Sequence, residues 1–340
     1  MASNNNNLHK AKKAKNDEFY TQLSDIEKEC YHYAKHFEGK TVLCNCNDAL
    51  HSGFAQYFSL KFEELGLKCL ICTAFNPDGH GQVHRYYGDK NGNRVPDIEE
   101  WDATEMEGNG GYGTPEGLAL IDEADIIVTN PPFSLFRDFV RILMEKNKKF
   151  LIIGNKNAIT YKEIFPYIKN NQIWIGVRQF SGGMWFYCEQ GSCSTEKNSE
   201  NGHIGNAAAC WFTNLDHNRR HKPLDLFCKY HPENYPKYDN YDAINVNKTV
   251  EIPMDYDGVM GVPISFLDKY CPEQFEIVDA RDYTEVSELK AKTTQLVKDG
   301  SGTIEGKAVY ARILIKNVDR SGVAAIAMSD LFHFSLRNTT

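Results

Sequence analysis

The sequence predicts an α/β protein in which a mostly parallel sheet carries helices on both faces and is followed by a smaller domain. Short apolar runs typical of buried strands alternate with helical patterns between residues 41 and 177. Apolar residues make up 41% of the 340 residues, so the chain can bury a substantial core. Beyond residue 178 glycine turns and aromatic runs replace this alternation, which indicates a change of architecture.

The first strand–helix–strand unit is preceded by a helix predicted from Leu23 to His36. Its apolar residues Ile26, Cys30 and Tyr33 recur at helical spacing, and Gly39 closes it. The elements expected next are a strand at 41–44, a polar turn at 45–48, a helix at 52–65 ended by Gly66, and a strand at 68–73.

The alternation continues after a long polar insert. The elements expected there are a strand at 125–129, a helix at 136–146, a strand at 150–153, a helix at 161–168 and a strand at 173–177. Two aromatic runs, 182–187 and 207–212, are separated by a polar loop and indicate an antiparallel hairpin that completes the sheet. The predicted segments are therefore a flexible basic arm at 1–16, a sheet domain at 17–214, a small domain at 215–316 and a tail at 317–340.

Composition excludes a membrane protein and leaves nucleic-acid binding open. No run reaches the roughly 18 apolar residues of a membrane span, and the amino-terminal start lacks the apolar core of a signal peptide, so a cytoplasmic location is expected. The net charge of −8 argues against a strongly basic nucleic-acid binder. Two local clusters of basic residues, 9–15 and 217–222, keep nucleic-acid binding open despite the net charge. Each cluster is also consistent with a solvated tail or loop.

The ten cysteines do not predict a metal site or disulfides. Cys69 and Cys72 lie on a predicted strand, where residues three apart face opposite ways and cannot share a tetrahedral metal. Buried thiols in a reducing compartment are the simpler interpretation, and no metal is expected.

The most informative segment is Asn130-Pro131-Pro132-Phe133, which directly follows the predicted strand Ile126–Thr129. In α/β sheets the chemistry lies at the carboxyl ends of the strands. The amino group of a nucleic-acid base is a poor nucleophile because its lone pair is spread into the ring. A catalyst that methylates it must therefore supply acceptors for its two hydrogens, which draws the lone pair back onto nitrogen. The Asn130 side chain and the Pro131 carbonyl can supply them, on a loop that the prolines hold rigid, while Phe133 stacks on the base. Ordinary turn chemistry is the alternative.

The turn after the first strand, Asn45 to Asp48, is the expected position of a cofactor. It lacks the glycines of a GxGxxG phosphate cradle, which weakens a dinucleotide interpretation. Asp48 can instead hydrogen-bond the ammonium and ribose of S-adenosylmethionine, although an aspartate here is also a common helix cap.

These segments resemble the EcoRI-type adenine-specific DNA methyltransferases. The resemblance runs from about residue 8 to 316, and the segments that carry it are 17–22, 41–46, 124–137, 149–155, 182–186 and 258–263. It implies a Rossmann-like S-adenosylmethionine-dependent methyltransferase sheet with a smaller carboxyl-terminal recognition domain. It also implies methyl transfer from S-adenosylmethionine to N6 of a flipped adenine in double-stranded DNA.

The resemblance also implies roles for individual positions. Tyr20, Thr21, Asn45, Asp48 and Asn130 would bind the cofactor, with the Tyr20 ring against the adenosyl group. The target base would be held by Asn130, Pro131, Pro132 and Phe133 and closed by Trp185 or Phe186. Where relatives carry an acidic residue that contacts the cofactor adenine, this chain has Gly111 within Gly108–Tyr112. Tyr20 and Trp185 are also consistent with core aromatics.

Sequence recognition is expected in residues 215–316. Candidate contacts to DNA are Arg219, Arg220 and Lys222, together with the polar loop 194–205 beside the pocket. The protein is expected to be a monomer or weak dimer, with a restriction endonuclease of the same specificity as a partner. Two alternatives stay open: a non-catalytic decoy that binds DNA or cofactor, and a methyltransferase that acts on RNA or a protein amide.

Overall fold

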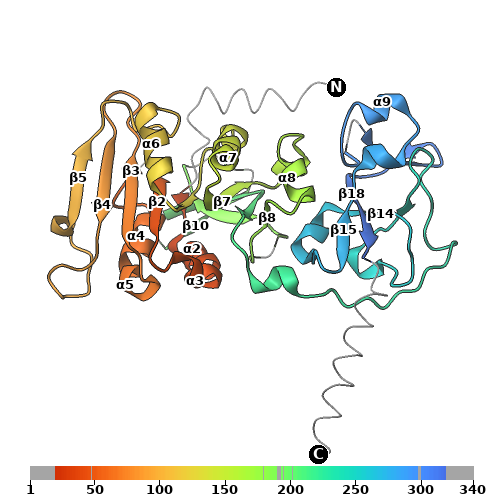
Figure 1. The fold of residues 1–340 in the computed structure, drawn as a ribbon, viewed down its shortest axis with the longest axis horizontal. Helices are drawn as coiled ribbons and strands as arrows, with labels where there is room; N and C mark the ends of the chain where they lie inside the picture. The colour runs from red at the N-terminus through yellow and green to blue at the C-terminus, as the bar shows by residue number, and fades with distance from the viewer. Residues whose placement is uncertain are drawn as a thin grey trace, which may run out of the picture. The chain divides into compact units, whose positions relative to one another are not determined.

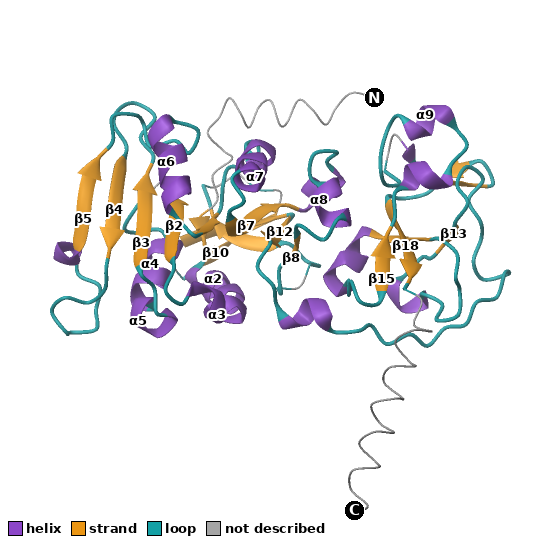
Figure 2. Cartoon of the chain, viewed as in Figure 1, coloured by secondary structure: helices purple, strands orange, loops and turns teal. Residues whose placement is uncertain are grey.

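The computed structural model describes residues 20–46, 48–178, 180–189, 193, 195–200, 202–297 and 300–318. The predicted basic arm lies outside the described residues, as does the predicted tail apart from Asn317 and Val318. The chain divides into two compact units whose boundary falls between Arg219 and Arg220. Figure 1 traces the chain through both units, and Figure 2 shows their secondary structure.

An eight-stranded mixed sheet forms the centre of the first unit. Its order is β5 (Trp101–Glu105), β4 (Gln82–Tyr86), β3 (Cys69–Ala74), β2 (Thr41–Cys46), β6 (Ile126–Thr129), β7 (Lys149–Asn155), β12 (Ala209–Thr213) and β8 (Trp174–Ile175). Strands β3, β2, β6 and β7 are parallel, and the pairings outside them are antiparallel. The expectation of a mostly parallel sheet therefore holds only for its central strands.

Helices cover both faces of the parallel strands (Figure 1). One face carries α2 (Leu23–Cys30), α3 (Ala34–Phe37), α4 (Gly53–Leu60) and α5 (Phe62–Leu65), and the other carries α6 (Pro115–Glu123) and α7 (Phe136–Glu145). Alternate β2 residues confirm this: Val42 and Cys44 belong to the core cluster with Ile26 and Phe58. The predicted helix 23–36 contains a 3₁₀ turn at Tyr31–Tyr33, and the helix 52–65 ends at Gly66 in a left-handed conformation.

The long polar insert before residue 125 is not a loop. It forms the antiparallel strands β4 and β5 and the helix α6, whose first turn is capped by the Thr114 hydroxyl. Strand β5 is at the sheet edge and most of its residues are exposed. Exposed edge strands carry polar residues, so the hydrophobic pattern gave no strand signal here.

A second sheet in the first unit has the order β1 (Tyr20–Thr21), β9 (Met184–Tyr187), β11 (Gly202–Ala207) and β10 (Thr195–Ser199). The expected hairpin between 182–187 and 207–212 is therefore wrong, because β9 pairs with β11 while β12 pairs with β7 in the large sheet. The expected polar loop at 194–205 is instead the β10–β11 hairpin. Ala208 separates two strands that belong to different sheets, a switch that no periodicity reveals.

The shorter helical elements of the first unit follow β7. A 3₁₀ helix spans Lys156–Thr160 and α8 spans Phe165–Lys169, so the helix predicted at 161–168 is shorter and begins later. Among the described residues, no helix is both long and apolar enough to cross a membrane. The described cysteines are free thiols, and the pair Cys69 and Cys72 is buried, as expected.

The second unit has short strands and many 3₁₀ turns. Its four-stranded sheet has the order β13 (Ile244–Asn245), β14 (Met260–Pro263), β18 (Arg312–Asn317) and β15 (Phe275–Ile277), and β16 (Thr303–Ile304) pairs with β17 (Lys307–Ala308). Its one described α-helix, α9, spans Ser287–Lys290. Tyr238, Tyr241, Leu296 and Leu314 belong to its core. The buried side-chain carbonyl of Asn245 in this unit accepts hydrogen bonds from both Tyr238 and Arg312.

Candidate active site

The candidate site lies where β2 and β6 end side by side. The chain leads from β2 to β3 on one side and returns to β6 on the other, so the direction of strand order reverses between β2 and β6. Ligands of open α/β sheets bind at such a reversal, outside the carboxyl ends of the strands. Asn45 stands at the end of β2, and Thr129 ends β6 immediately before Asn130.

A cavity of about 350 Å³ opens at this position. It is lined by the ends of three parallel strands, the loop before α6, and the start of the loop after β6. These residues are Asn45, Thr73, Phe75, Asn109, Gly110, Gly111, Tyr112, Gly113, Thr114, Thr129, Pro131, Pro132, Leu135 and Phe139. The walls combine aromatic surface with backbone and a few polar groups, as in small-molecule sites.

Asn45 carries the strongest indication that the cavity holds a ligand. Both polar atoms of its side chain are buried, and neither has a hydrogen-bond partner among the described residues. Its backbone carbonyl, by contrast, accepts from the Thr129 hydroxyl at 2.5 Å. An unsatisfied buried amide costs about 1 to 3 kcal/mol, so a donor and an acceptor are missing from this wall.

The loop from Gly108 to Tyr112, which holds Gly111 where the resemblance implies an acidic residue in relatives, contributes to the wall of the cavity. Gly110 has a φ of +81°, and a Cβ there would meet the Ala74 carbonyl at 2.5 Å, so only glycine fits. The Asn109 side chain accepts from the Gly111 N–H at 3.1 Å. The cavity-lining residues include no carboxylate; instead the Tyr112 and Phe139 rings meet edge to face at 4.8 Å.

The Asn-Pro-Pro-Phe loop lies directly beside this cavity. Pro131 and Pro132 line it, and the Asn130 side-chain NH₂ donates to the Thr21 hydroxyl at 3.3 Å. The Leu135 N–H donates to the Pro132 carbonyl, which turns the chain into α7. Phe133 is partly buried against the core of the unit. The structure thus brings Thr21, Asn45 and the loop Asn130–Phe133 to one end of the sheet.

Asp48 is not among the residues that line the cavity. Its carboxylate accepts from the backbone N–H groups of Leu50 and His51 and pairs with the His51 ring at 3.1 Å. Burial raises the pKa of Asp48, but the hydrogen bonds from His51 and Leu50 outweigh it and lower the pKa below its usual value. Asp48 therefore closes a turn, which is close to its alternative interpretation as a cap.

The predicted aromatic residues meet in the second sheet. Tyr20 lies opposite Tyr187, and Thr21 opposite Phe186. Phe186 is fully buried and belongs to the core cluster, whereas Trp185 is part-exposed and carries the Lys197 ammonium 4.4 Å from its ring centre. Neither Tyr20, which is 51% exposed, nor Trp185 lines the cavity.

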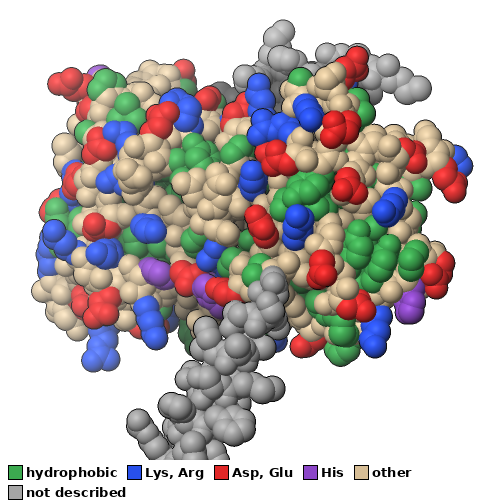
Figure 3. Space-filling view, turned by 45° about the vertical axis from the view of Figure 1, so that its right-hand side comes forward, with side chains coloured by type: hydrophobic (Ala, Val, Ile, Leu, Met, Phe, Trp, Pro, Cys, Tyr) green, Lys and Arg blue, Asp and Glu red, His purple; other side chains and the backbone are tan. Residues whose placement is uncertain are grey.

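The basic cluster at 217–222 is only partly available to DNA. His217 is buried, with Nε2 3.1 Å from the Ile175 carbonyl, and Arg219 donates to the Val177 carbonyl. Arg220 is half-buried, and Lys222 is exposed. On the face drawn in Figure 3, described basic and acidic side chains are intermingled rather than gathered into one basic surface.

Sequence reasoning missed the apolar wall of the cavity, which is formed by the aromatic side chains of Phe75, Tyr112 and Phe139 together with Leu135. A signal existed for Phe75, because it follows β3 at the edge where the neighbouring parallel strands also end. Tyr112 and Phe139 come from a loop and a helix. Only the packing of α6 and α7 on the sheet brings them together.

Fold and site together define a Rossmann-like methyltransferase, with the Asn130 loop beside a cavity at the strand reversal. The family model for adenine-specific methyltransferase EcoRI matches residues 7–318, and the chain belongs to this family.

Two curated relatives agree with this assignment. Type II methyltransferase M.EcoRI of Escherichia coli is 44% identical over 336 residues, which cover 93% of this chain and 98% of that protein. Type II methyltransferase M.MpnI of Mycoplasma pneumoniae is 39% identical over 323 residues, covering 91% and 97%. No solved structure shows significant similarity to the chain.

Proposed function

We propose that the protein is a site-specific DNA adenine methyltransferase that transfers a methyl group from S-adenosylmethionine to N6 of adenine. The observation that carries the proposal is the Asn130–Phe133 loop, which follows β6 and borders a cavity whose Asn45 amide has no hydrogen-bond partner among the described residues. The family and the type II names of its relatives support DNA as the substrate.

The residues of the cavity fit S-adenosylmethionine. The cofactor has a flat adenine, hydroxyls and charged amino-acid groups but no phosphate, and the cavity offers aromatic rings and an unpaired amide without a phosphate cradle. Asn45 would bind its polar portion, and Phe75 and Tyr112 would contact its adenine in place of the missing carboxylate. The bound cofactor supplies an electrophilic methyl group on a sulfonium.

Asn130 and Pro131 act on the target amine. The Asn130 side-chain carbonyl and the Pro131 backbone carbonyl would each accept one hydrogen of the adenine NH₂, which draws the lone pair back onto nitrogen. Thr21 holds the other end of the Asn130 amide by accepting from its NH₂ at 3.3 Å, so the carbonyl oxygen is directed away from that bond. Pro131 and Pro132 keep the loop rigid.

The adenine must leave the duplex to reach this loop, which costs a few kcal/mol and requires stacking surfaces. Phe133 is proposed on one face of the base. Of the two residues considered for the other face, Trp185 is part-exposed and Phe186 is fully buried, which favours Trp185. Tyr20 is proposed to cover the cofactor when the site is filled.

The second unit is proposed to read the DNA sequence, because the pocket itself contacts only the flipped base. Arg220 and Lys222 remain candidate DNA contacts. The Arg219 guanidinium already donates a hydrogen bond to the Val177 carbonyl. The type II names of the relatives favour a companion restriction endonuclease of the same specificity. A monomer or weak dimer acting on DNA in the cytoplasm completes the proposal.

The decisive experiment supplies the purified protein with methyl-labelled S-adenosylmethionine and, separately, double-stranded DNA, RNA and protein from a host that lacks it. We expect label only in DNA, as N6-methyladenine at one short sequence by methylome sequencing. Label in RNA or in a glutamine amide would replace the DNA assignment. Tight cofactor binding without transfer to any of the three would indicate a decoy.

A further inference from the structure

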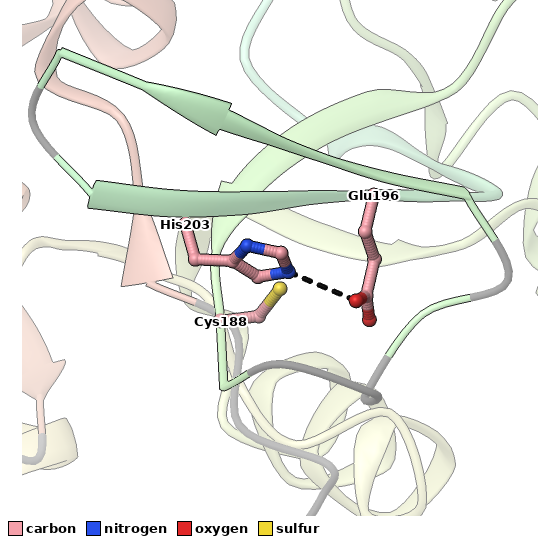
Figure 4. Close-up of side chains that lie close together, drawn as sticks. All are labelled: Cys188, Glu196 and His203. Atoms are coloured by element: carbon pink, nitrogen blue, oxygen red, sulfur yellow. Dashed lines mark hydrogen bonds and ion pairs between the residues drawn. The ribbon is translucent and has the colours of Figure 1, made fainter.

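We propose that the protein binds a zinc ion at the end of the β10–β11 hairpin, through Cys188, Glu196 and His203, with Cys193 as the fourth ligand. The ligand atoms of the first three residues all lie within 4.8 Å of one another. Figure 4 shows the three side chains pointing into one space from the hairpin and the end of β9. This differs from the expectation of no metal, which weighed only Cys69 and Cys72.

The strand register explains why these side chains converge. Glu196 lies opposite Gly205, and Asn198 lies opposite His203, so Glu196 and His203 are diagonal neighbours on one face of the hairpin. Gly205 also lies opposite Phe186, and Cys188 follows Phe186 by two residues and faces the same way. The Cys188 N–H donates to the His203 carbonyl at 3.2 Å, which fixes the two residues side by side.

Gly205 makes room for both sulfurs. A Cβ at this position would lie 2.5 Å from the Cys193 sulfur and 2.8 Å from the Cys188 sulfur. The two thiols also hydrogen-bond each other. Cys193 is thus held next to Cys188, although its sulfur is not one of the three ligand atoms that lie within 4.8 Å of one another.

The polar partners of His203 and Glu196 match a metal site with its supporting contacts. The Glu196 carboxylate lies 2.9 Å from Nε2 of His203, and the side-chain carbonyl oxygen of Asn198 lies 3.1 Å from its Nδ1. Both ring nitrogens therefore face acceptors. A metal at Nε2 with Nδ1–H donated to Asn198 satisfies this arrangement without a second ring proton. The other Glu196 oxygen accepts from the Cys193 N–H at 2.6 Å, which orients the carboxylate.

The donor set selects zinc. Two thiolates, an imidazole and a carboxylate are ligands that Zn²⁺ takes in four-coordinate sites, whereas calcium and magnesium require oxygen. The Glu196 and His203 side chains are only 15% and 21% exposed, so the site is largely closed, as structural zinc sites are.

The site would hold together the sheet that presents the proposed target-base residues. On its other face the same hairpin carries Lys197, whose ammonium lies over the Trp185 ring, and β9 pairs with β1 at Thr21. Zinc would cross-link the end of β9 to the β10–β11 hairpin on the face opposite to Trp185 and Lys197. The inference itself does not depend on the proposed function, because metal content is measured without any methyl-transfer assay.

The test measures zinc in the full-length protein purified with added zinc under reducing conditions. We expect one zinc per chain. C188S and H203A should bind zinc at least about 100-fold more weakly, and N198A, which removes only the supporting contact, about 10-fold more weakly. The controls C228S and H231A, which change a cysteine and an exposed histidine of the second unit, should keep one zinc.

Two further measurements protect the test against misfolded variants. Cobalt substitution of the unmutated protein should give a thiolate-to-cobalt charge-transfer band, which C193S should halve. H203C, which supplies another zinc ligand, should restore binding lost in H203A. A metal-free protein with a Cys188–Cys193 disulfide by mass, or with both thiols free and open to alkylation, would overturn the proposal. A band unchanged in C193S would overturn the role of Cys193.

Discussion

Two asparagines with buried side-chain amides distinguish the two units of this protein. In the second unit Asn245 accepts from the Tyr238 hydroxyl at 2.8 Å and from the Arg312 guanidinium at 3.2 Å, and its NH₂ donates to Asn247. In the first unit the side-chain Nδ2 and Oδ1 atoms of Asn45 are both buried and have no hydrogen-bond partner among the described residues. The side chain of the same residue type thus makes three hydrogen bonds in one place and none among the described residues in the other.

The difference teaches which polar groups serve the fold and which await a ligand. A buried amide whose bonds are all made holds its neighbours in one arrangement, and its loss leaves their donors unpaired. A buried amide with no bonds destabilises the free protein and is retained where a ligand supplies the partners. We therefore expect substitutions at the two positions to act on different quantities.

The largest effect is expected for Asn130→Ala, in the loop beside Asn45. The change removes the side-chain acceptor for the target NH₂ and raises the barrier to transfer by at least about 3 kcal/mol, a loss of more than about 100-fold in kcat. Cofactor affinity should stay within about threefold, because the cavity wall is formed by Pro131 and Pro132 rather than by this side chain.

Single-turnover methylation and cofactor titration measure the two quantities of this prediction separately. The control is Asn170→Ala, an exposed asparagine at the end of α8 in the same unit, which should leave both unchanged. A kcat within tenfold of normal in Asn130→Ala would remove this residue from the chemistry.

The next effect is expected for Asn245→Ala, on stability rather than on transfer. The substitution leaves the Tyr238 hydroxyl and the Arg312 Nε–H buried without their acceptor, which should lower the free energy of unfolding by about 2 to 3 kcal/mol. Asn247→Ala removes only the exposed acceptor of the same network and should cost less than about 0.5 kcal/mol. Urea unfolding compares the two, and equal costs would show that the network contributes nothing special.

Asn45→Ala should act in the opposite way. The free energy of unfolding of the free protein should rise by about 1 to 3 kcal/mol, because no hydrogen bond among the described residues is lost and a buried amide without partners is removed. The affinity for S-adenosylmethionine should fall about tenfold, since one bond to the cofactor contributes about 1.4 kcal/mol. Calorimetric titration measures the affinity. An unchanged affinity would mean that the unpaired amide does not face the cofactor.

The same comparison explains how much the sequence could reveal. The strands that end at the site, β2 and β6, and the helix α7 are continuous apolar or amphipathic patterns, and they were predicted from those patterns. The assignment of individual residues to the cofactor and to the target base came from the family resemblance. Where Tyr20 and Trp185 lie relative to a bound cofactor and base stays a prediction.

What escaped the sequence depends on long-range register. The edge strands β4 and β5 and the β10–β11 hairpin are polar, so they carry no core-facing pattern. Phe186 lies in the core rather than on a base because alternate residues of β9 face opposite ways, which favours Trp185. The cluster of Cys188, Glu196 and His203 arises only from the pairing of three strand segments.

The smallest effect is expected for Asp48→Asn, three residues from Asn45, because this polar group is bonded but half exposed. Burial raises the pKa of Asp48, but the hydrogen bonds from His51 and Leu50 lower it by more, so that the net pKa lies below the usual value. A lowered folded-state pKa contributes stability above the unfolded value near pH 4 that is lost as pH falls through the folded value. Since the carboxyl side chain is 49% exposed, solvent screening limits the contribution to less than about 0.5 kcal/mol.

Urea unfolding of Asp48→Asn should therefore show a small loss of unfolding free energy at pH 7 that disappears near pH 2. Asp78→Asn, an exposed aspartate between β3 and β4, is the control. A loss that persists at pH 2 would mean that the turn needs the shape of the side chain and not its charge.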